Sequence, residues 1–196
     1  MLTIAKTKLD FNFKHWDKLL FEEHTDYDLA GCIDAVALKS LDGKVHNFYR
    51  QGDTENPEDF SYTAYYKLFK SLVDYFEVQT TRVRIHRQLP GKETPLHTDD
   101  NNKGIKEASE YNLRLLTALT ESNDFIYKFK HEGIVEQIKL KTGESVIFDP
   151  DTVAHGMINK SKTKTRYSLI QVFKAYPVTN WLTEFINKEQ IIKLCT

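Results

Sequence analysis

The sequence predicts a mainly β protein, built as an all-β barrel or double-sheet jelly roll with flanking helices. From residue 111 onward, short runs rich in aromatic and β-branched residues follow one another, separated by turn residues. The helical spacing i, i+3, i+4, i+7 occurs outside this region, most clearly over residues 62–76. Such a barrel offers a mouth in which a small ligand can bind.

We expect one domain over residues 1–196, because this length can bury a single substantial core. Residues 1–80 are predicted to support the barrel with a short amphipathic helix around Trp16, a hairpin of residues 35–38 and 44–48, and the helix at 62–76. Residues 81–176 are predicted to form the barrel core. Residues 177–196 are predicted to form a C-terminal amphipathic helix.

The composition excludes several classes of protein. Lys and Arg (27) nearly balance Asp and Glu (28), so the chain has no large net positive charge that would attract nucleic acid or an anionic membrane. Cys32 and Cys195 stand far apart, which favours a reducing compartment over a disulfide scaffold. No signal peptide and no bilayer-spanning run is recognisable. We therefore expect a cytoplasmic protein without membrane or nucleic-acid partners, and the sequence leaves its oligomeric state open.

A candidate metal site comes from His97, Asp99 and a distant His155. Residues two apart on a strand project to the same side, so His97 and Asp99 can face one ion together. Two His and one carboxylate occupy one face of an octahedron and leave the opposite positions open, as in non-haem Fe(II) oxygenases.

A candidate carboxylate-binding site lies further along the chain, at Arg166 and Ser168. Arg166 and Ser168 share one face of a predicted strand at 164–173. A guanidinium binds a carboxylate with two parallel hydrogen bonds, and a nearby hydroxyl adds a third donor. A dicarboxylate that chelates the metal at one end needs such an anchor at the other, and 2-oxoglutarate is a molecule of this kind.

Several motifs occur together in a fixed order over residues 82–173. They are Leu89-Pro90-Gly91, His97-Thr98-Asp99, Arg114 opening a strand, Gly143 to Asp149, His155-x-x-x-Asn159 and Arg166. In order and spacing this set resembles the 2-oxoglutarate/Fe(II)-dependent oxygenases, specifically the aspartyl/asparaginyl β-hydroxylase-like family. Many members of that family have a His two residues after the position of Arg114, where this chain has Leu116.

The resemblance implies a double-stranded β-helix core (jelly-roll, cupin-like) and a set of roles for individual residues. It implies iron bound by His97, Asp99 and His155, the distal carboxylate of 2-oxoglutarate bound by Arg166 and supported by His86, and Arg114 near the metal-chelating end. The implied reaction is hydroxylation of an unactivated C–H bond by O2, giving succinate and CO2. The implied substrate is an amino-acid side chain of Asp, Asn or Pro type, in a free amino acid or a peptide.

Other interpretations remain open. The chain could be a cupin-like metal-binding barrel with a different reaction, or a binding or sensor module without catalysis. A buried Arg114 needs an anion, which a structural salt bridge or a bound cosubstrate would supply equally well. Residues 100–109 form either a substrate lid or a plain connection. Candidate substrate contacts are residues 50–53, Asp100, Asn101, Asn102 and Asn159, of which Asn159 also suits a structural role in a turn.

Overall fold

The computed structural model describes residues 2–6, 13–23, 31–45, 57–76, 80–99, 111–175 and 190–193. Strands predominate, and the helical elements are short. The elements in chain order are β1 (Leu2–Lys6), η1 (Trp16–Lys18), β2 (Glu22–Glu23), β3 (Asp34–Ser40), η2 (Pro57–Asp59), β4 (Ser61–Tyr62), α1 (Tyr66–Val73), η3 (Asp74–Phe76), β5 (Thr80–Gln88), β6 (Glu93–His97), β7 (Tyr111–Ala118), β8 (Phe125–His131), β9 (Ile134–Ile138), β10 (Glu144–Phe148), β11 (Ala154–Asn159), β12 (Arg166–Ala175) and β13 (Gln190–Lys193).

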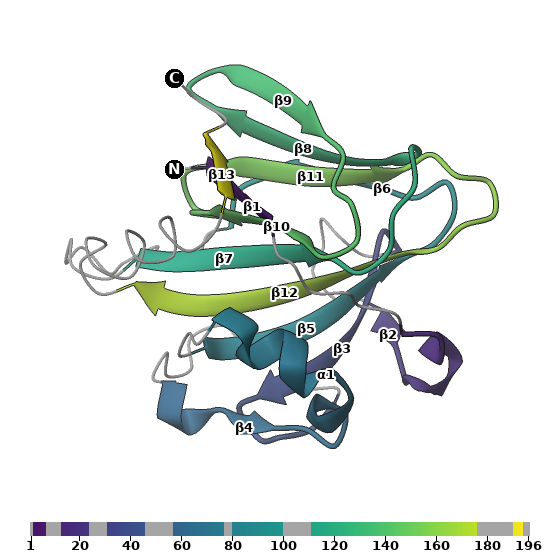
Figure 1. Ribbon diagram of the computed structural model, residues 1–196, viewed down its shortest axis with the longest axis vertical. Helices are drawn as coiled ribbons and strands as arrows, with labels where there is room; N and C mark the ends of the chain where they lie inside the picture. Colours follow the sequence, from purple (N-terminus) through teal and green to yellow (C-terminus); the bar gives the residue numbers. More distant parts are fainter. Residues whose placement is uncertain are drawn as a thin grey trace.

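The strands form two antiparallel sheets (Figure 1). The large sheet has the order β13-β1-β10-β7-β12-β5-β3-β2, with β4 also paired to β3. The small sheet has the order β6-β11-β8-β9. The neighbours are mostly not consecutive in sequence, so the chain passes back and forth between the sheets. This is the jelly-roll arrangement predicted from the run of short strands, and the predicted fold class is confirmed.

One apolar core fills the space between the sheets. Leu116 and Ile170 of the large sheet belong to the same buried cluster as Tyr127 and Phe129 of the small sheet. Side chains alternate between the faces of a strand, so the even-numbered residues of β12 and β7 near this cluster point inward. The functional residues described below lie on the same inward face.

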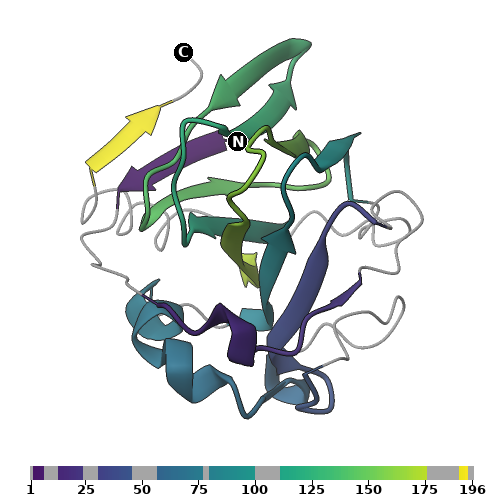
Figure 2. The same ribbon diagram turned by 90° about the vertical axis from the view of Figure 1, so that its right-hand side faces the viewer.

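A second core covers the opposite face of the large sheet. Ile85 and Leu169 pack there against the apolar side of α1, formed by Phe69, Leu72 and Val73. The helix lies below the large sheet in Figure 1 and on the opposite side from the small sheet, which Figure 2 shows from the side. The amphipathic helix predicted over residues 62–76 is thus present as α1 followed by one turn of η3.

The predicted flanking elements differ from the structure in two places, and the predicted hairpin lies partly outside the described residues. The helix expected around Trp16 is a single 3₁₀ turn, and β3 and the Asp42-Gly43 turn are present while residues 46–48 lie outside the described residues. The C-terminal helix does not extend over residues 190–193, which form β13 and pair with β1. Residues 176–189 lie outside the described part of the chain. The strand follows from tertiary pairing, because β1 extends the large sheet and offers an edge to Ile191 and Ile192.

Among the described residues, no helix is long and apolar enough to cross a membrane.

Candidate active site

The two histidines of the predicted triad are neighbours across a pair of strands. His97 ends β6, His155 lies in β11, and their Cα atoms are direct partners in the ladder. Their ring centroids are 4.5 Å apart. Pro95 and Leu96 lie opposite the single residue Gly156, which makes a bulge beside the histidines. The bulge re-aims β6, so the two imidazoles face each other.

Backbone contacts fix the orientation of both rings. His97 Nδ1 lies 2.9 Å from the carbonyl oxygen of Pro95, and His155 Nδ1 lies 3.2 Å from that of Val153. A carbonyl oxygen only accepts hydrogen bonds, so Nδ1 carries the proton in each ring. The lone pair of a neutral ring is therefore on Nε2, the tautomer that a second-shell carbonyl selects in metal-binding histidines.

Asp99 completes the cluster from the segment after β6. Its backbone N–H donates to the carbonyl of Pro150 at 2.9 Å, which holds the turn beside β11. Its Oδ1 lies 3.6 Å from His97 Nε2 and 3.7 Å from His155 Nε2. One ligand atom from each of the three residues lies within 4.8 Å of the other two. The structure thus brings His97, Asp99 and His155 together as the sequence predicted.

Arg114 enters this cluster from β7 in the large sheet. Its guanidinium pairs with Asp99 Oδ2 and donates from Nη1 to His155 Nε2 at 2.9 Å. The side chain is buried, and its Nε has no hydrogen-bond partner among the residues that the structure describes. Of the two anions considered for Arg114, the structural ion pair is present, and its partner is the carboxylate of the triad itself.

The surroundings keep His155 and Asp99 in the protonation states that bind metal. Burial lowers the pKa of the His155 imidazole, and the nearby charge of Arg114 contributes to a value of about 3. Burial raises the pKa of Asp99, but Arg114 and the two histidines together outweigh it and hold that pKa well below its ordinary value. At neutral pH, His155 is neutral and Asp99 is anionic, as metal coordination requires.

Arg166 lies deeper in the space between the sheets. It is the first residue of β12, and only 2% of its surface is exposed. Its guanidinium carbon lies 4.8 Å from the ring centre of Tyr127 in β8, and its Nη1 has no hydrogen-bond partner in the described part of the chain. Burial lowers the pKa of Arg166 to about 10, so the side chain stays charged at neutral pH. A buried guanidinium with an unsatisfied N–H suits an anionic ligand.

Ser168 and His86 lie beside Arg166 on the inward face. The Oγ of Ser168 lies 3.1 Å from the hydroxyl of Tyr127, so Arg166 and Ser168 both approach one aromatic residue. His86 is the direct Cα partner of Ser168 in the neighbouring strand β5, and it is buried. All residues assigned to the predicted cosubstrate site therefore line the interior of the barrel.

Two further residues of the interior were not singled out from the sequence. Tyr127 lies against both Arg166 and Ser168, and Arg84 of β5 is buried. The sequence could have indicated Arg84 through its spacing, because it stands two residues before His86 and therefore shares a face of the strand with it. For Tyr127, the signal was its position between Phe125 and Phe129, since residues at every second position of a strand share one face.

Asn159 has the structural role that the sequence offered as the alternative to a substrate contact. The side chain is completely buried at the end of β11. Its Nδ2 lies within hydrogen-bond distance of the carbonyls of Gln88 (3.0 Å), Leu89 (3.1 Å) and Lys164 (2.9 Å), and its Oδ1 accepts from the N–H of Ser161 at 3.0 Å. The amide thus fixes the loops that precede β6 and β12, and both its ends are used.

We expect Asn159→Ala to destabilise the protein by at least about 1–3 kcal/mol, because each buried polar group left without a partner costs about this amount. Urea unfolding of the variant measures the change. Asn123→Ala is the matched control, since Asn123 is exposed in a turn and should leave stability within about 0.5 kcal/mol of the parent. Normal stability with lost substrate turnover would restore the substrate-contact interpretation of Asn159.

The remaining predicted contacts, residues 50–53 and 100–102, lie outside the described residues, as does the segment 100–109 considered as a lid. Their roles stay predictions.

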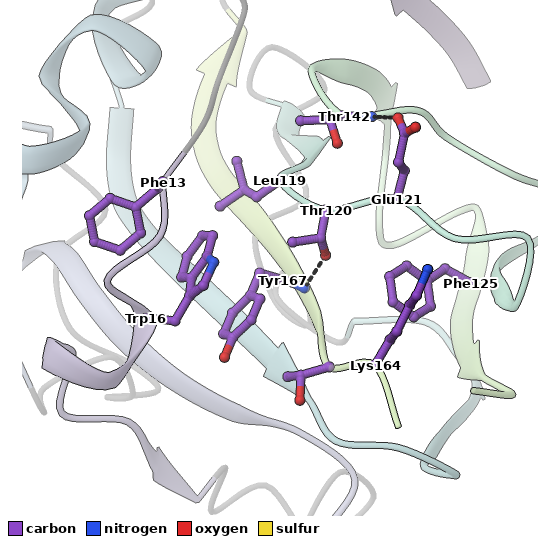
Figure 3. A pocket seen from close by; sticks show the side chains of 10 residues that line it. Phe13, Trp16, Leu119, Thr120, Glu121, Phe125, Thr142, Lys164 and Tyr167 are labelled. Carbon is purple, nitrogen blue, oxygen red and sulfur yellow. Dashed lines mark hydrogen bonds between the residues drawn. The ribbon is translucent and has the colours of Figure 1, made fainter. Parts of the chain in front are cut away.

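A separate cavity of about 500 Å³ lies on the outer face of β12 (Figure 3). Tyr167, which alternates with Arg166 and Ser168, points into it and stacks on Trp16 with ring centroids 3.9 Å apart. None of the predicted site residues lines this cavity. Its lining residues are Phe13, Trp16, Leu119, Thr120, Glu121, Phe125, Thr142, Lys164, Thr165 and Tyr167.

Solved structures identify the architecture. No family model and no curated protein matches the sequence. The chain is similar to an oxidoreductase of the 2OG-Fe(II) oxygenase family from Burkholderia pseudomallei, with a TM-score of 0.52 and 14% identity over 80% of this chain and 72% of that one. The chain has the fold of that family. A prolyl hydroxylase from Trichoplax adhaerens, solved in complex with a hypoxia inducible factor peptide fragment, is similar at a TM-score of 0.52 and 14% identity, over 81% of this chain and 73% of that one. In this double-stranded β-helix the triad lies on the small sheet and the turn after β6, while the three buried arginines come from the large sheet.

Proposed function

We propose that the protein is an Fe(II)- and 2-oxoglutarate-dependent dioxygenase that hydroxylates an amino-acid side chain. One observation carries the proposal. Two imidazoles with their Nε2 atoms within 3.7 Å of one carboxylate oxygen lie in the same barrel as a buried guanidinium that has an N–H without a hydrogen-bond partner among the described residues. The first group suits a divalent metal, the second suits a carboxylate, and the similar solved structures have the same fold.

His97, Asp99 and His155 would hold the metal through Nε2, Oδ1 and Nε2. The second oxygen of Asp99 stays paired with Arg114, which favours coordination through one oxygen. The Arg114 Nη1 now shares the lone pair of His155 Nε2, so metal binding requires the guanidinium to leave that nitrogen. The released N–H groups would then be available to the metal-chelating end of a bound cosubstrate.

Arg166 would bind the distal carboxylate of 2-oxoglutarate. Ser168 and Tyr127 supply hydroxyl donors beside it, and His86 stands in the adjacent strand. Bound together, Fe(II) and 2-oxoglutarate activate O2, release succinate and CO2, and provide one oxygen atom for a C–H bond of the substrate. The protein orients these partners, keeps competing molecules away and determines which C–H bond is presented.

The substrate we propose is an amino-acid side chain of Asp, Asn or Pro type, as in the aspartyl/asparaginyl β-hydroxylase-like family that the motifs resemble. Both a free amino acid and a peptide suit this chemistry. The Trichoplax prolyl hydroxylase, which was solved with a peptide fragment, is a precedent for a peptide in this fold.

The decisive experiment adds Fe(II) and then 2-oxoglutarate to the metal-free protein without oxygen. The chelated complex gives a weak visible charge-transfer band, and we expect it to form with one equivalent of each. If iron binds and no band forms, the proposal fails, and a metal-binding barrel with another reaction takes its place. If neither binds, the chain is a binding or sensor module.

Arg166→Ala tests the carboxylate anchor in the same assay. Removing one partner of a buried charge-assisted contact costs about 2–5 kcal/mol, so the concentration of 2-oxoglutarate needed for the band should rise roughly 30-fold or more. Iron binding should be retained. Arg87→Ala is the control, because Arg87 lies on the opposite face of the adjacent strand and pairs with Asp34 at 2.6 Å. An unchanged 2-oxoglutarate requirement in Arg166→Ala would refute the anchor.

A further inference from the structure

Gln88 lies buried at the end of β5, directly opposite the proposed carboxylate anchor. It is the Cα partner of Arg166 in the ladder between β5 and β12, and only 1% of its surface is exposed. Residues directly opposite each other in a ladder project to the same face, with their Cβ atoms about 5 Å apart. The side chain of Gln88 therefore points into the interior of the barrel, beside the guanidinium of Arg166.

The amide of Gln88 is tied to the small sheet through its nitrogen. Nε2 donates to Thr94 Oγ1 at 3.2 Å and to the carbonyl oxygen of Met157 at 3.4 Å. A carbonyl oxygen only accepts hydrogen bonds, so it is the nitrogen of the amide that faces Met157. Both N–H groups of the amide are thus used. Thr94 and Met157 are partners in the ladder between β6 and β11, so Gln88 links the two sheets.

The free ends of Gln88 and Arg166 are complementary. Gln88 Oε1 and Arg166 Nη1 are both enclosed, and neither has a hydrogen-bond partner in the part of the chain that the structure describes. The first is an acceptor, and the second carries two N–H donors. Leaving a buried polar atom without a partner is unfavourable, so a bond between these two atoms would stabilise both.

The backbones on either side of this pair are also held together. Asn159 Nδ2 lies 3.0 Å from the carbonyl oxygen of Gln88 and 2.9 Å from that of Lys164, two residues before Arg166. The end of β5 and the start of β12 are therefore fixed relative to each other. The long side chain of Arg166 is the part of this arrangement that still needs a fixed orientation.

We propose that Gln88 positions Arg166 for the distal carboxylate of the cosubstrate. Its Oε1 accepts a hydrogen bond from Nη1, directly or through one buried water molecule, and so holds the guanidinium in one orientation. Nη1 keeps a second N–H for the carboxylate. A guanidinium that is already oriented binds more tightly, because less conformational freedom is lost on binding. This inference rests on the proposed function and adds a positioning residue to the same site.

A double-mutant cycle on the metal-free protein tests the contact between the two residues. Gln88→Met and Arg166→Met, alone and combined, replace polar side chains by apolar ones of similar length, and urea unfolding is measured for each. We expect the double variant to lose less stability than the two single variants together. The difference should be a factor of about 3 or more in the equilibrium constant for unfolding.

Gln171 provides the matched control for this cycle. It is completely buried in β12, its Nε2 donates to the carbonyl oxygen of Val73 at 3.0 Å, and its Oε1 has no partner among the described residues. It differs from Gln88 in its place, because it lies on the α1 side of the sheet and five residues from Arg166, a separation of about 16 Å along the strand. The effects of Gln171→Met and Arg166→Met should therefore add.

The charge-transfer band separates positioning of Arg166 from a general distortion of the barrel. It is recorded without oxygen on the full-length protein with Fe(II), first with 2-oxoglutarate and then with 2-oxopentanoate. The second compound has the same carbon chain and the same chelating groups but lacks the distal carboxylate. Gln88→Met should raise the concentration of 2-oxoglutarate needed for the band about 10-fold. Binding of 2-oxopentanoate and of iron should be unchanged, because Gln88 acts through Arg166 alone.

Gln88→Glu distinguishes direct contact with Arg166 from simple loss of the amide. A carboxylate at this position pairs with the guanidinium and competes with the cosubstrate for it. We therefore expect Gln88→Glu to require more 2-oxoglutarate than Gln88→Met, again with no change for 2-oxopentanoate. Gln171→Met should behave as the parent with both compounds.

Three results would overturn the inference. Additive effects in the cycle would show that Gln88 does not hold Arg166. Equal weakening of 2-oxoglutarate and 2-oxopentanoate is the result expected if Gln88 only joins the two sheets. The third is a Gln88→Glu variant that binds 2-oxoglutarate as well as Gln88→Met does. A parent protein that forms no band would refute the proposed function and the cosubstrate role of Gln88 with it, while coupling in the cycle would still establish the contact with Arg166.

Discussion

His97→Ala is expected to abolish stoichiometric binding of Fe(II). His97 supplies one of three ligand atoms, and the remaining pair, Asp99 and His155, is already engaged by Arg114. A metal held by two protein atoms in competition with a guanidinium should bind weakly. The fall in affinity should exceed the roughly 10- to 100-fold typical of mutations in outer-shell partners of a ligand. Anaerobic titration calorimetry with Fe(II) measures the loss.

Substitution of His97 tests the metal site with a smaller effect on stability than substitution of Asp99. The hydrogen bond of His97 Nδ1 is to a backbone carbonyl, and Asp99 keeps its ion pair with Arg114 when His97 is removed, so no buried charge loses its ion-pair partner. Asp99→Ala should also abolish iron binding, but it leaves the buried Arg114 without its ion-pair partner, a change that typically costs about 3–5 kcal/mol of stability. His15→Ala serves as the control, because His15 is exposed beside η1. Full iron occupancy in His97→Ala would show that the ligand assignment is wrong.

Local patterns explain what the sequence predicted well. The two-residue spacing of His97 and Asp99 and the turn residues between the strands are properties of short segments, so they can be recognised without knowing the fold. The strand predicted at 164–173 and the shared face of Arg166 and Ser168 follow from the same alternation. The order of the motifs then implied the barrel that joins them.

Long-range pairing explains what the sequence did not predict. Whether a residue such as Arg84 faces solvent or a cavity depends on which sheet lies above its strand, and alternation alone gives the two faces without saying which is covered. The strand at 190–193 exists because β1 offers it an edge, although its apolar residues also suited a helix. Asn159 looked like a turn residue or a substrate contact, and only the approach of three separate carbonyls shows its role.

Gly156→Ala is expected to damage the metal site without changing any ligand. A Cβ at this position would lie 2.7 Å from the carbonyl oxygen of Thr94 and 2.8 Å from that of Pro95. Both are backbone atoms of β6, which cannot rotate away, so the strand itself must shift. Since β6 presents His97 to His155 next to this contact, the shift separates the two imidazoles. We expect stability to fall by about 1–3 kcal/mol, as for other overpacked sites, and iron affinity to fall about 10- to 100-fold.

Gly133→Ala separates the loss of stability from the loss of geometry. Gly133 lies in the β8–β9 turn with a φ of 83°, and an added Cβ there has no heavy atom within 4 Å. The left-handed backbone makes alanine unfavourable by about 1–2 kcal/mol, so this variant should lose a similar amount of stability. Its iron affinity should match the parent, because neither β6 nor β11 is touched. Equal iron affinities in the two variants, measured by calorimetry well below their unfolding midpoints, would mean that close approach of β6 at Gly156 does not position His97. A selective loss in Gly156→Ala would place the control of triad geometry in the β6 bulge, where a residue without a side chain decides how closely two metal ligands can approach.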